Sequence, residues 1–433
     1  MFWKLPPEII ILRKPVSSEI RSAKAAAIEH RVFMKPAAIS GFGTPARRSS
    51  HISFIIGRQS NTYLGRSGAE PPGCADSSLT GYSRLQPSAA SAGGEIDLAE
   101  TFPSWNADSA SLKELVDFVA AATDEESPDY LEPADRIAVF DMDGTILCEK
   151  APVYIDYCLT MYRVLDDPDY KATAQEQSAM QQVRDHAYSE GQTFHPEGLT
   201  KDDLVASAFA GMTPEEFRDY VVDFADHTEA VGFEGMTYGE SFYKPMIEVV
   251  KFLKASDFDV WIVSACEREV VRALVERFDI PYDHVIATDV PYVVSGKGED
   301  EAADDYNMAR DEEILLGAPL DEVECGKSGK PAAIAREIGK RPVLAFGNSS
   351  GDYSMLNYAE GNPDHTGMGF FVVCDDTERE YGSDEKAAEY YGVVEEEGWT
   401  PFSMADDWKT IYGDDVEKTE LPGIEAEELP NAS

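Results

Sequence analysis

Two aspartates that directly follow an apolar run are the residues of this chain best suited to chemistry. Residues 136–147 read R-I-A-V-F-D-M-D-G-T-I-L, so Asp141 and Asp143 end an apolar stretch and precede a glycine turn. A magnesium ion takes oxygen ligands and bridges carboxylate to phosphate, which gives a reason for two such charges to lie together. One carboxylate can attack phosphorus while the other moves protons on the leaving oxygen and on the hydrolytic water. The alternative for this motif alone is an ordinary acidic turn after a strand.

A second apolar run offers groups that could bind a phosphate. Residues 260–265 read V-W-I-V-S-A, and the run ends in Ser264. The hydroxyl of Ser264 and the amide of Ala265 could hold a phosphoryl oxygen, although a serine after a strand is usually turn chemistry. With Gly144 from the first motif, Ser264 and Ala265 form the predicted phosphate-binding set.

A lysine opens a predicted helix farther along the chain. The sequence G-K-P at 329–331 brings Lys330 to the start of a helical pattern at 331–338. The helix dipole favours anions at this end, so the lysine is better explained if it neutralises acidic groups and a phosphate in a shared site. Lys327 is a competing candidate for the same role.

A fourth segment could complete a metal site. Residues 343–356 read V-L-A-F-G-N-S-S-G-D-Y-S-M-L, an apolar run followed by a glycine-rich turn that carries Asn348 and Asp352. An amide oxygen and a carboxylate at this spacing suit a hard cation, and glycine permits a tight backbone there. The predicted Mg²⁺ ligands are Asp141, Asp143, Asn348 and Asp352.

The elements that must position these residues alternate between strands and helices. Helical patterns at 245–253, 267–277 and 331–338 separate short apolar runs of strand character. This alternation predicts an α/β fold with a mostly parallel sheet covered on both faces, and ligands then bind at the carboxyl ends of the strands. The five predicted strands are 137–140, 260–263, 285–287, 343–346 and 370–373.

The alternation of strands and helices is interrupted by one long segment, residues 151–244, which has helical patterns and many aromatic residues. Within it Thr213, Pro214 and Glu216 have the order expected of a capped helix start. We interpret the segment as a helical cap inserted after the first strand, over the active edge of the sheet. An acid and several aromatics would suit an amine-bearing phosphate, such as phosphoserine or phosphocholine, by ion pairing and cation–π contact. The candidate substrate residues, some of which could instead be cap core, are Glu149, Tyr154, Tyr157, Phe209, Phe242 and Tyr243.

The remaining segments give the predicted division of the chain. The first part is basic in an otherwise acidic protein and lacks a helical or strand period, so it is read as a disordered or targeting extension. The predicted parts are the extension at 1–97, a hydrolase core at 98–150 and 245–415, the cap at 151–244 and an acidic tail at 416–433.

The overall charge restricts the partners. A formal net charge of −44 makes nucleic acids and anionic membranes repulsive surfaces. No apolar run is long enough to span a membrane, and the six cysteines contain no CxxC pair that would suggest a zinc site or a disulfide framework. A cytoplasmic location is expected, with export left open, and the sequence does not indicate an oligomeric state.

Together the four motifs resemble the haloacid dehalogenase-like hydrolase superfamily, and within it the phosphoserine phosphatase-like branch with a helical cap. More closely, the chain resembles a group of bacterial proteins named only as haloacid dehalogenase-like hydrolases. The motifs shared with that group are S-W-N at 104–106, R-I-A-V-F-D at 136–141, A-F-A-G-M-T at 208–213, F-Y-K-P-M at 242–246 and F-G-N-S at 346–349. The resemblance covers about residues 104–415. It implies a three-layer, Rossmann-like fold, in which five parallel strands form the central sheet in the order 5-4-1-2-3.

The resemblance also implies roles for the motif residues. Asp141 would be the nucleophile that forms an aspartyl-phosphate, and Asp143 the general acid and base, which binds Mg²⁺ through its main-chain carbonyl. Ser264 would bind phosphate, and Lys330 would steady the nucleophile and the phosphate. Asn348 and Asp352 would complete the metal site. Asn348 departs from the family, which usually has an acid there, so weaker metal binding or a shifted role for Asp352 is expected.

The expected reaction is hydrolysis of a small phosphorylated metabolite. Dehalogenases lack the second acid of the first motif, so Asp143 argues against dehalogenation. A phosphotransferase or phosphomutase remains an alternative, since the same aspartate pair can transfer phosphate to a sugar hydroxyl. A catalytically silent phosphate-binding module is the other alternative. It has no need of Asp141, Asp143, Ser264 and Lys330 together.

Overall fold

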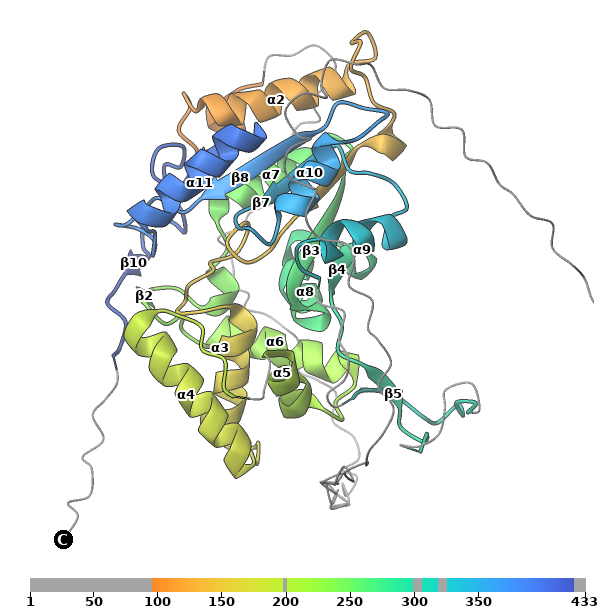
Figure 1. Ribbon diagram of the computed structural model, residues 1–433, viewed down its shortest axis with the longest axis vertical. Helices are drawn as coiled ribbons and strands as arrows, with labels where there is room; N and C mark the ends of the chain where they lie inside the picture. The colour runs from red at the N-terminus through yellow and green to blue at the C-terminus, as the bar shows by residue number, and fades with distance from the viewer. Residues whose placement is uncertain (1–95, 198–200, 299–305, 318–324, 424–433) are drawn as a thin grey trace, which may run out of the picture. The chain divides into compact units, whose positions relative to one another are not determined.

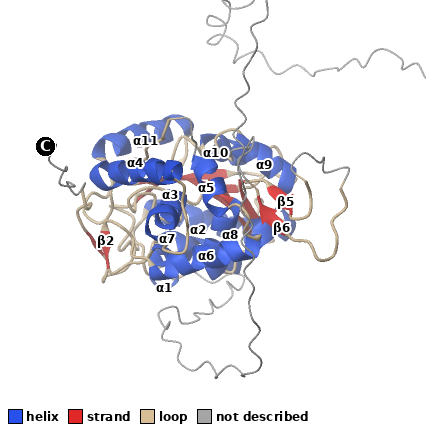
Figure 2. Ribbon diagram, turned by 90° about the horizontal axis from the view of Figure 1, so that it is seen from below, coloured by secondary structure: helices blue, strands red, loops and turns tan. Residues whose placement is uncertain are grey.

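The computed structural model describes residues 96–197, 201–298, 306–317 and 325–423. The extension expected at 1–97 lies almost wholly outside the described residues, as does the end of the expected acidic tail, 424–433. Because the first apolar run is followed by alternating strands and helices, the described chain forms an α/β fold with its strands between two layers of helices (Figures 1 and 2).

The central sheet has six parallel strands in the order β4-β3-β1-β7-β8-β9. The first five, read from the other side, have the predicted order 5-4-1-2-3, which is confirmed. The sixth strand, β9, was not predicted. It contains Pro401, which cannot donate to a ladder and is tolerated here because β9 is an edge strand. The strands are β1 (Ile137–Phe140), β3 (Asp259–Glu267), β4 (Val285–Thr288), β7 (Leu344–Gly347), β8 (Met368–Val373) and β9 (Thr400–Ser403).

A row of buried phenylalanines crosses one face of the sheet. The Phe140 and Phe346 rings are stacked with centroids 4.1 Å apart, and Phe346 and Phe370 follow at 5.1 Å. Phe402 continues the row at 4.9 Å from Phe370. All four side chains are fully buried. This row fixes the register of β1, β7, β8 and β9, since a slip of one residue would turn each ring to the other face.

Two hydrophobic clusters cover the two faces of the sheet. The phenylalanine face packs against α2 (Ala110–Thr123), α7 (Lys244–Ala255) and α8 (Arg268–Val275). The opposite face packs against α9 (Gly329–Glu337), α10 (Tyr353–Glu360) and α11 (Asp384–Glu397). The three-layer architecture expected from the sequence is therefore present (Figure 2).

The segment between β1 and α7 is mainly helical. Its helix α6 begins as predicted, with Thr213 and Glu216 forming a reciprocal capping box and Pro214 in the first turn. A short strand, β2 (Phe233–Glu234), pairs with β10 (Glu417–Lys418), which lies at the start of the expected tail. The helices of this segment are α3 (Ile155–Met161), the π-helical turn η2 (Tyr162–Asp166), α4 (Ala174–Glu190), α5 (Lys201–Phe209) and α6 (Pro214–His227).

A second insertion follows β4. The strands β5 (Tyr292–Val294) and β6 (Ile314–Leu316) form an antiparallel ribbon. The short helices α1 (Leu98–Thr101), η1 (Pro133–Asp135), η3 (Tyr238–Glu240), η4 (Glu276–Phe278) and η5 (Tyr282–His284) complete the described elements. Among the helices of the described ranges, none has the length and apolar character needed to cross a bilayer.

Candidate active site

Lys330 connects the carboxyl ends of three neighbouring strands. Its Nζ lies 2.5 Å from Asp141 Oδ1 after β1 and 2.7 Å from the Val263 carbonyl oxygen of β3. It also lies 2.7 Å from Asp352 Oδ1, in the loop that follows β7. The lysine side chain is 2% exposed. Its competitor Lys327 is exposed, so the structure brings Lys330 to the aspartates.

The charges of this cluster do not balance. Burial raises the pKa of Asp141 to about 7; the nearby Asp352 carboxylate adds to the rise, and Lys330 opposes it. Burial alone would lower the pKa of Lys330, but Asp141 and Asp352 together raise it above the ordinary value, which keeps the lysine charged. One lysine faces two buried carboxyl groups, so the site has room for a further positive charge.

Asp352 orders the loop after β7. Its Oδ2 accepts hydrogen bonds from the main-chain amides of Asn348 at 3.0 Å and Ser349 at 3.1 Å. Its Oδ1 accepts from Lys330, and the side chain is 1% exposed. Asp352 thus holds both the lysine and the backbone that carries Asn348.

The side-chain amide of Asn348 faces the first motif. In one orientation its nitrogen donates to Asp141 Oδ2 at 3.2 Å and to the main-chain oxygen of Asp143 at 3.1 Å. In the other orientation the amide oxygen faces these two acceptors. Three converging oxygens suit a hard cation, since adjacent oxygens around octahedral Mg²⁺ lie about 2.9 Å apart. The donor set therefore fits Mg²⁺ through one carboxylate, one main-chain oxygen and one amide oxygen.

This set differs from a metal site built of acidic side chains alone. Within the described part of the chain, no three His, Cys, Asp or Glu side chains gather in a way that could hold a metal ion. The structure brings together Asp141, the main-chain oxygen of Asp143, Asn348 and Asp352. Their ligation of a metal remains a prediction.

Gly144 and Thr145 complete the turn after the aspartates. Gly144 has a φ of +82°, and a Cβ on it would lie 1.9 Å from Asn348 Nδ2. The buried Thr145 hydroxyl lies 3.4 Å from Asp141 Oδ2 and 3.3 Å from Asn348 Oδ1. Sequence reasoning quoted this threonine within its motif but assigned it no role. Its position directly after Gly144 was the available signal.

Ser264 lies in a strand that is longer than predicted. β3 continues to Glu267, with an irregular register against β4 between Val263 and Glu267. The Ser264 hydroxyl is 1% exposed and accepts a hydrogen bond from the Cys266 amide at 3.0 Å. The preceding carbonyl, of Val263, is the one that binds Lys330. Ser264 is therefore one residue beyond the lysine contact, and the half-buried Ala265 follows it.

The predicted substrate residues separate into two groups. The Tyr154 hydroxyl donates to Glu149 Oε1 at 3.2 Å, and Tyr154 is 37% exposed. Burial and the Glu149 carboxylate raise the pKa of Tyr154, and Asp143 and Asp141 add to this rise. Burial raises the pKa of Glu149, and Asp352 contributes. The carboxylates of the aspartate cluster therefore contribute to the raised pKa of both residues.

The side chains of the other four candidates are buried and pack against other residues of the protein. The Tyr157 hydroxyl lies 3.0 Å from His195 Nδ1, and Phe242 packs edge-on against Phe278 at 4.6 Å. Phe209 packs against Phe217 at 4.4 Å, and Tyr243 lies beside Trp408 and Tyr412. These aromatics form part of the hydrophobic core.

A parallel sheet with an aspartate pair, a buried lysine and an Asn–Asp loop at its carboxyl edge defines an α/β protein whose candidate site lies where such folds bind their ligands. The chain belongs to the haloacid dehalogenase-like hydrolase family, whose profile matches residues 138–357. This match supports a phosphatase-type activity and confirms the family expected from the motifs. No curated protein matches the chain.

Several solved structures share low similarity with the chain. A functionally unknown protein from Anaerococcus prevotii DSM 20548 has 15% identity and a TM-score of 0.40, over 67% of this chain and 91% of that one. A protein of unknown function from Bordetella pertussis Tohama I has 16% identity and a TM-score of 0.38, over 62% and 97%. A phosphoserine phosphohydrolase-like protein from Francisella tularensis subsp. tularensis SCHU S4 has 12% identity and a TM-score of 0.31, over 55% and 87%.

Proposed function

We propose that the protein is a magnesium-dependent phosphomonoester hydrolase that forms an aspartyl-phosphate on Asp141. The observation that carries the proposal is the buried contact of Lys330 with both Asp141 and Asp352, at 2.5 and 2.7 Å. A buried lysine between two carboxyl groups gives the nucleophile a fixed orientation and gives a phosphoryl group a nearby cation. Membership of a hydrolase family supports the same class of reaction.

In the first step a carboxylate oxygen of Asp141 attacks the phosphorus of the substrate. The bond between phosphorus and the substrate's ester oxygen breaks, and Asp143 gives its proton to that oxygen. The Ser264 hydroxyl and the Ala265 amide hold phosphoryl oxygens, and Lys330 compensates their charge. The first product leaves as a neutral alcohol.

In the second step a water molecule attacks the phosphorus of the aspartyl-phosphate. Asp143, now a carboxylate, takes a proton from this water, and the bond between phosphorus and the Asp141 oxygen breaks. Inorganic phosphate leaves, and both aspartates return to their starting states. Bound between Asp141, the Asp143 main-chain oxygen and Asn348, Mg²⁺ would supply positive charge to the transferring phosphoryl group.

The substrate class rests on Glu149 and Tyr154. Their hydrogen bond presents an acid beside a partly exposed aromatic ring. This pair suits a small phosphorylated metabolite that carries an amine, such as a phosphoserine-like or phosphocholine-like molecule. The helical segment at 151–244 would act as the cap that contributes Tyr154 and restricts access of water.

Turnover of p-nitrophenyl phosphate with and without Mg²⁺ tests the reaction. We expect activity with Mg²⁺, loss of activity on chelation with EDTA, and a loss of at least about a thousandfold in Asp141→Asn. Asp135→Asn is the matched control, since the partly exposed Asp135 pairs with Lys340 and His365 rather than with Lys330. Full activity of Asp141→Asn would exclude Asp141 as the nucleophile.

A substrate panel then separates the alternatives. Faster hydrolysis of choline phosphate and phosphoserine than of sugar phosphates, lost in Glu149→Gln, would support the substrate class. Transfer of phosphate to an added sugar phosphate, at a higher rate than release to water, would favour a phosphomutase. Binding of phosphate without turnover of any compound would favour a silent module.

A further inference from the structure

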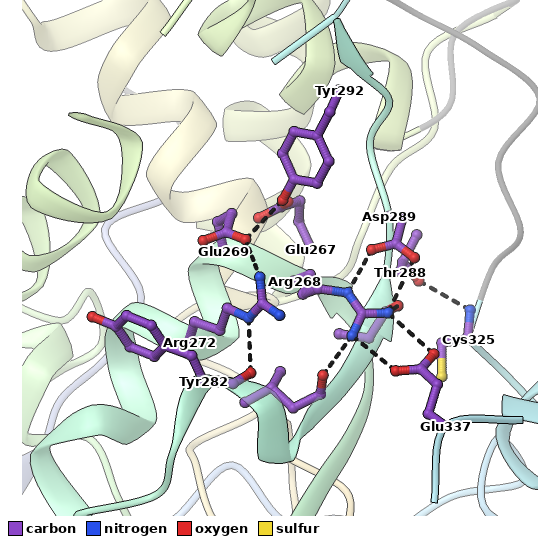
Figure 3. A network of polar contacts seen from close by, with 12 residues as sticks. Glu267, Arg268, Glu269, Arg272, Tyr282, Thr288, Asp289, Tyr292, Cys325 and Glu337 are labelled. Carbon is purple, nitrogen blue, oxygen red and sulfur yellow. Dashed lines mark hydrogen bonds and ion pairs between the residues drawn. The ribbon is translucent and has the colours of Figure 1, made fainter. Parts of the chain in front are cut away.

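Glu269 is a fully buried acid of α8 that contacts two other parts of the protein and one residue of its own helix. Its side chain is 1% exposed. Its Oε2 pairs with Arg218 of α6, while Oε1 pairs with Arg272 of α8 at 2.6 Å and accepts a hydrogen bond from the Tyr292 hydroxyl of β5 at 2.7 Å. Figure 3 shows Glu269 between Arg272 and Tyr292. The carboxylate therefore connects its own core helix, α8, to the inserted helical segment and to the ribbon after β4.

The contacts of Glu269 favour its charged form. Burial raises the pKa of this carboxyl, but Tyr292, Arg218 and Arg272 outweigh burial and lower it below the ordinary value. Arg218 also packs over the Tyr282 ring at 4.7 Å and lies 3.3 Å from Glu215, which is mostly exposed. Glu269 is thus the buried partner of Arg218, and Glu215 is its exposed partner.

The ribbon after β4 also binds the turn before α6, through main-chain hydrogen bonds. The Gly211 amide donates to the Leu316 carbonyl at 2.9 Å, and the Leu316 amide donates to the Met212 carbonyl at 2.8 Å. Gly211 and Met212 lie in the turn directly before α6. The start of α6 is therefore held by β6 through main-chain bonds and by Glu269 through an ion pair.

Glu269 is also close in sequence to groups of the candidate active site. It lies five residues after Ser264, and its neighbour Arg268 pairs with Asp289 at 2.5 Å and with Glu337 at 3.2 Å (Figure 3). Glu337 ends α9, the helix whose first turn carries Lys330. Residues 268 and 269 consequently connect the lysine helix on one side and the helical segment on the other.

We propose that Glu269 is a positioning residue that holds α6, and with it the helical segment, in a fixed place over the active edge. The inference rests on the proposed phosphatase function. Removing the negative charge of Glu269 leaves Arg218 without its buried partner, so the start of α6 loosens while the sheet and its aspartates stay in place. Substrate then loses contacts from the segment, and the Michaelis constant rises more than the turnover number falls.

Glu269→Gln tests the proposal by two independent measurements. With p-nitrophenyl phosphate and Mg²⁺ we expect KM to rise about tenfold and kcat to change by less than about threefold. Hydrogen–deuterium exchange of the unliganded protein should be faster in α6 and at 210–213, with β1 and β7 unchanged. Glu215→Gln removes the exposed partner of the same arginine and is the matched control, in which neither quantity should change.

The outcomes separate this proposal from the proposed function. Unchanged exchange in α6 of Glu269→Gln would overturn the positioning role, and so would faster exchange of β1 and β7, which indicates general loosening. If the wild-type protein lacks phosphatase activity while α6 alone loosens, the anchoring is supported and the phosphatase function is not. If Glu269→Gln does not fold, Tyr292→Phe removes one of the three contacts and should raise KM about threefold with the same exchange pattern; no change would overturn the proposal.

Discussion

Lys330 Nζ lies 2.5 Å from Asp141 Oδ1, although 189 positions separate the two residues in the chain. The contact exists because β1 and α9 both present their ends at the carboxyl edge of one parallel sheet. A lysine that is 2% exposed must be compensated, and Asp141 and Asp352 provide that compensation. The pair therefore makes the proposed nucleophile and its counter-charge a single structural unit.

Replacement of this lysine should remove activity and also weaken the fold. In Lys330→Met two buried carboxyl groups lose their cation, so we expect kcat/KM for p-nitrophenyl phosphate to fall by about a hundredfold or more. The free energy of unfolding should fall by about 3 kcal/mol, because one partner of a buried ion pair is removed. Urea denaturation and steady-state kinetics measure the two effects.

Lys327→Met is the control for this change. Lys327 is exposed and three residues away, so both activity and stability should stay within about twofold and about 0.5 kcal/mol of the wild type. A larger loss in Lys327→Met than in Lys330→Met would reverse the assignment of the two lysines.

Asn348 should set the magnesium requirement. Its side chain faces Asp141 and the Asp143 carbonyl but carries no charge. In Asn348→Asp a carboxylate replaces the amide, so we expect the Mg²⁺ concentration for half-maximal activity to fall by about tenfold. Without Mg²⁺ the variant should be less stable than the wild type, since a further negative charge joins Asp141 and Asp352.

Thermal unfolding with and without Mg²⁺ checks both expectations. Asn357→Asp, at an exposed position on α10, adds the same charge outside the site and should not alter the Mg²⁺ dependence. An unchanged or higher Mg²⁺ requirement in Asn348→Asp would show that residue 348 does not face the cation.

Much of the fold was predictable because local patterns determine it. Apolar runs ending in acidic or glycine residues indicated β1 and β7 closely, and the Thr213–Glu216 capping box fixed the start of α6. The edge strand β9 was missed, since it is short and contains Pro401. β10 was assigned to the tail because two residues carry no period.

The sequence predicted which residues lie near one another in the candidate site, but it did not predict their burial or their contacts. The sequence predicted that Asp141, Asp143 and Lys330 would lie together, because parallel strands end at one edge of the sheet, and the chemistry assigned to them stays a prediction. Sequence could not separate the exposed Tyr154 from the buried Tyr157 and Phe242, since an aromatic residue can line a chamber or fill a core. It also gave no sign that Glu269 would meet Arg218, as long-range ion pairs leave no local pattern.

Gly144 should tolerate no side chain. Its φ of +82° disfavours an L residue, and a Cβ would lie 1.9 Å from Asn348 Nδ2. Gly144→Ala should displace Asn348, lower the free energy of unfolding by about 1–3 kcal/mol and reduce activity by at least about tenfold. Denaturant unfolding and p-nitrophenyl phosphate turnover measure the change.

Gly392→Ala is the opposite case and serves as the control. Gly392 lies inside α11, and nothing lies within 4 Å of a Cβ there. Alanine in a helix interior should raise stability by about 0.5–1 kcal/mol and leave activity unaltered. Equal effects of the two substitutions would contradict the close contact between Gly144 and Asn348.

Glu267 should make the stability of the protein depend on pH near neutrality. Burial raises the pKa of this carboxyl to about 8, and the neighbouring Glu269 adds to the rise, while the Val270 amide opposes it. The folded state then binds a proton that the unfolded state has released, between pH 4.5 and about 8. The contribution of Glu267 is fully present below pH 4.5 and is lost as the pH rises through 8.

Glu267→Gln removes this proton, so the variant should lose less stability than the wild type between pH 5 and 8. The slope should decrease by up to about 1.4 kcal/mol per pH unit, and the variant should be the more stable protein at pH 8. Glu269→Gln provides the contrast, because the pKa of Glu269 is lowered and its contribution is instead lost as the pH falls below the ordinary glutamate range. Urea unfolding at pH 5, 6.5 and 8 measures the Glu267 effect, whereas the difference between Glu269→Gln and the wild type should stay constant over this range and decrease only at about pH 3.5 and below. Parallel stability curves for the wild type and Glu267→Gln would show that Glu267 is ionised in the folded protein throughout this range.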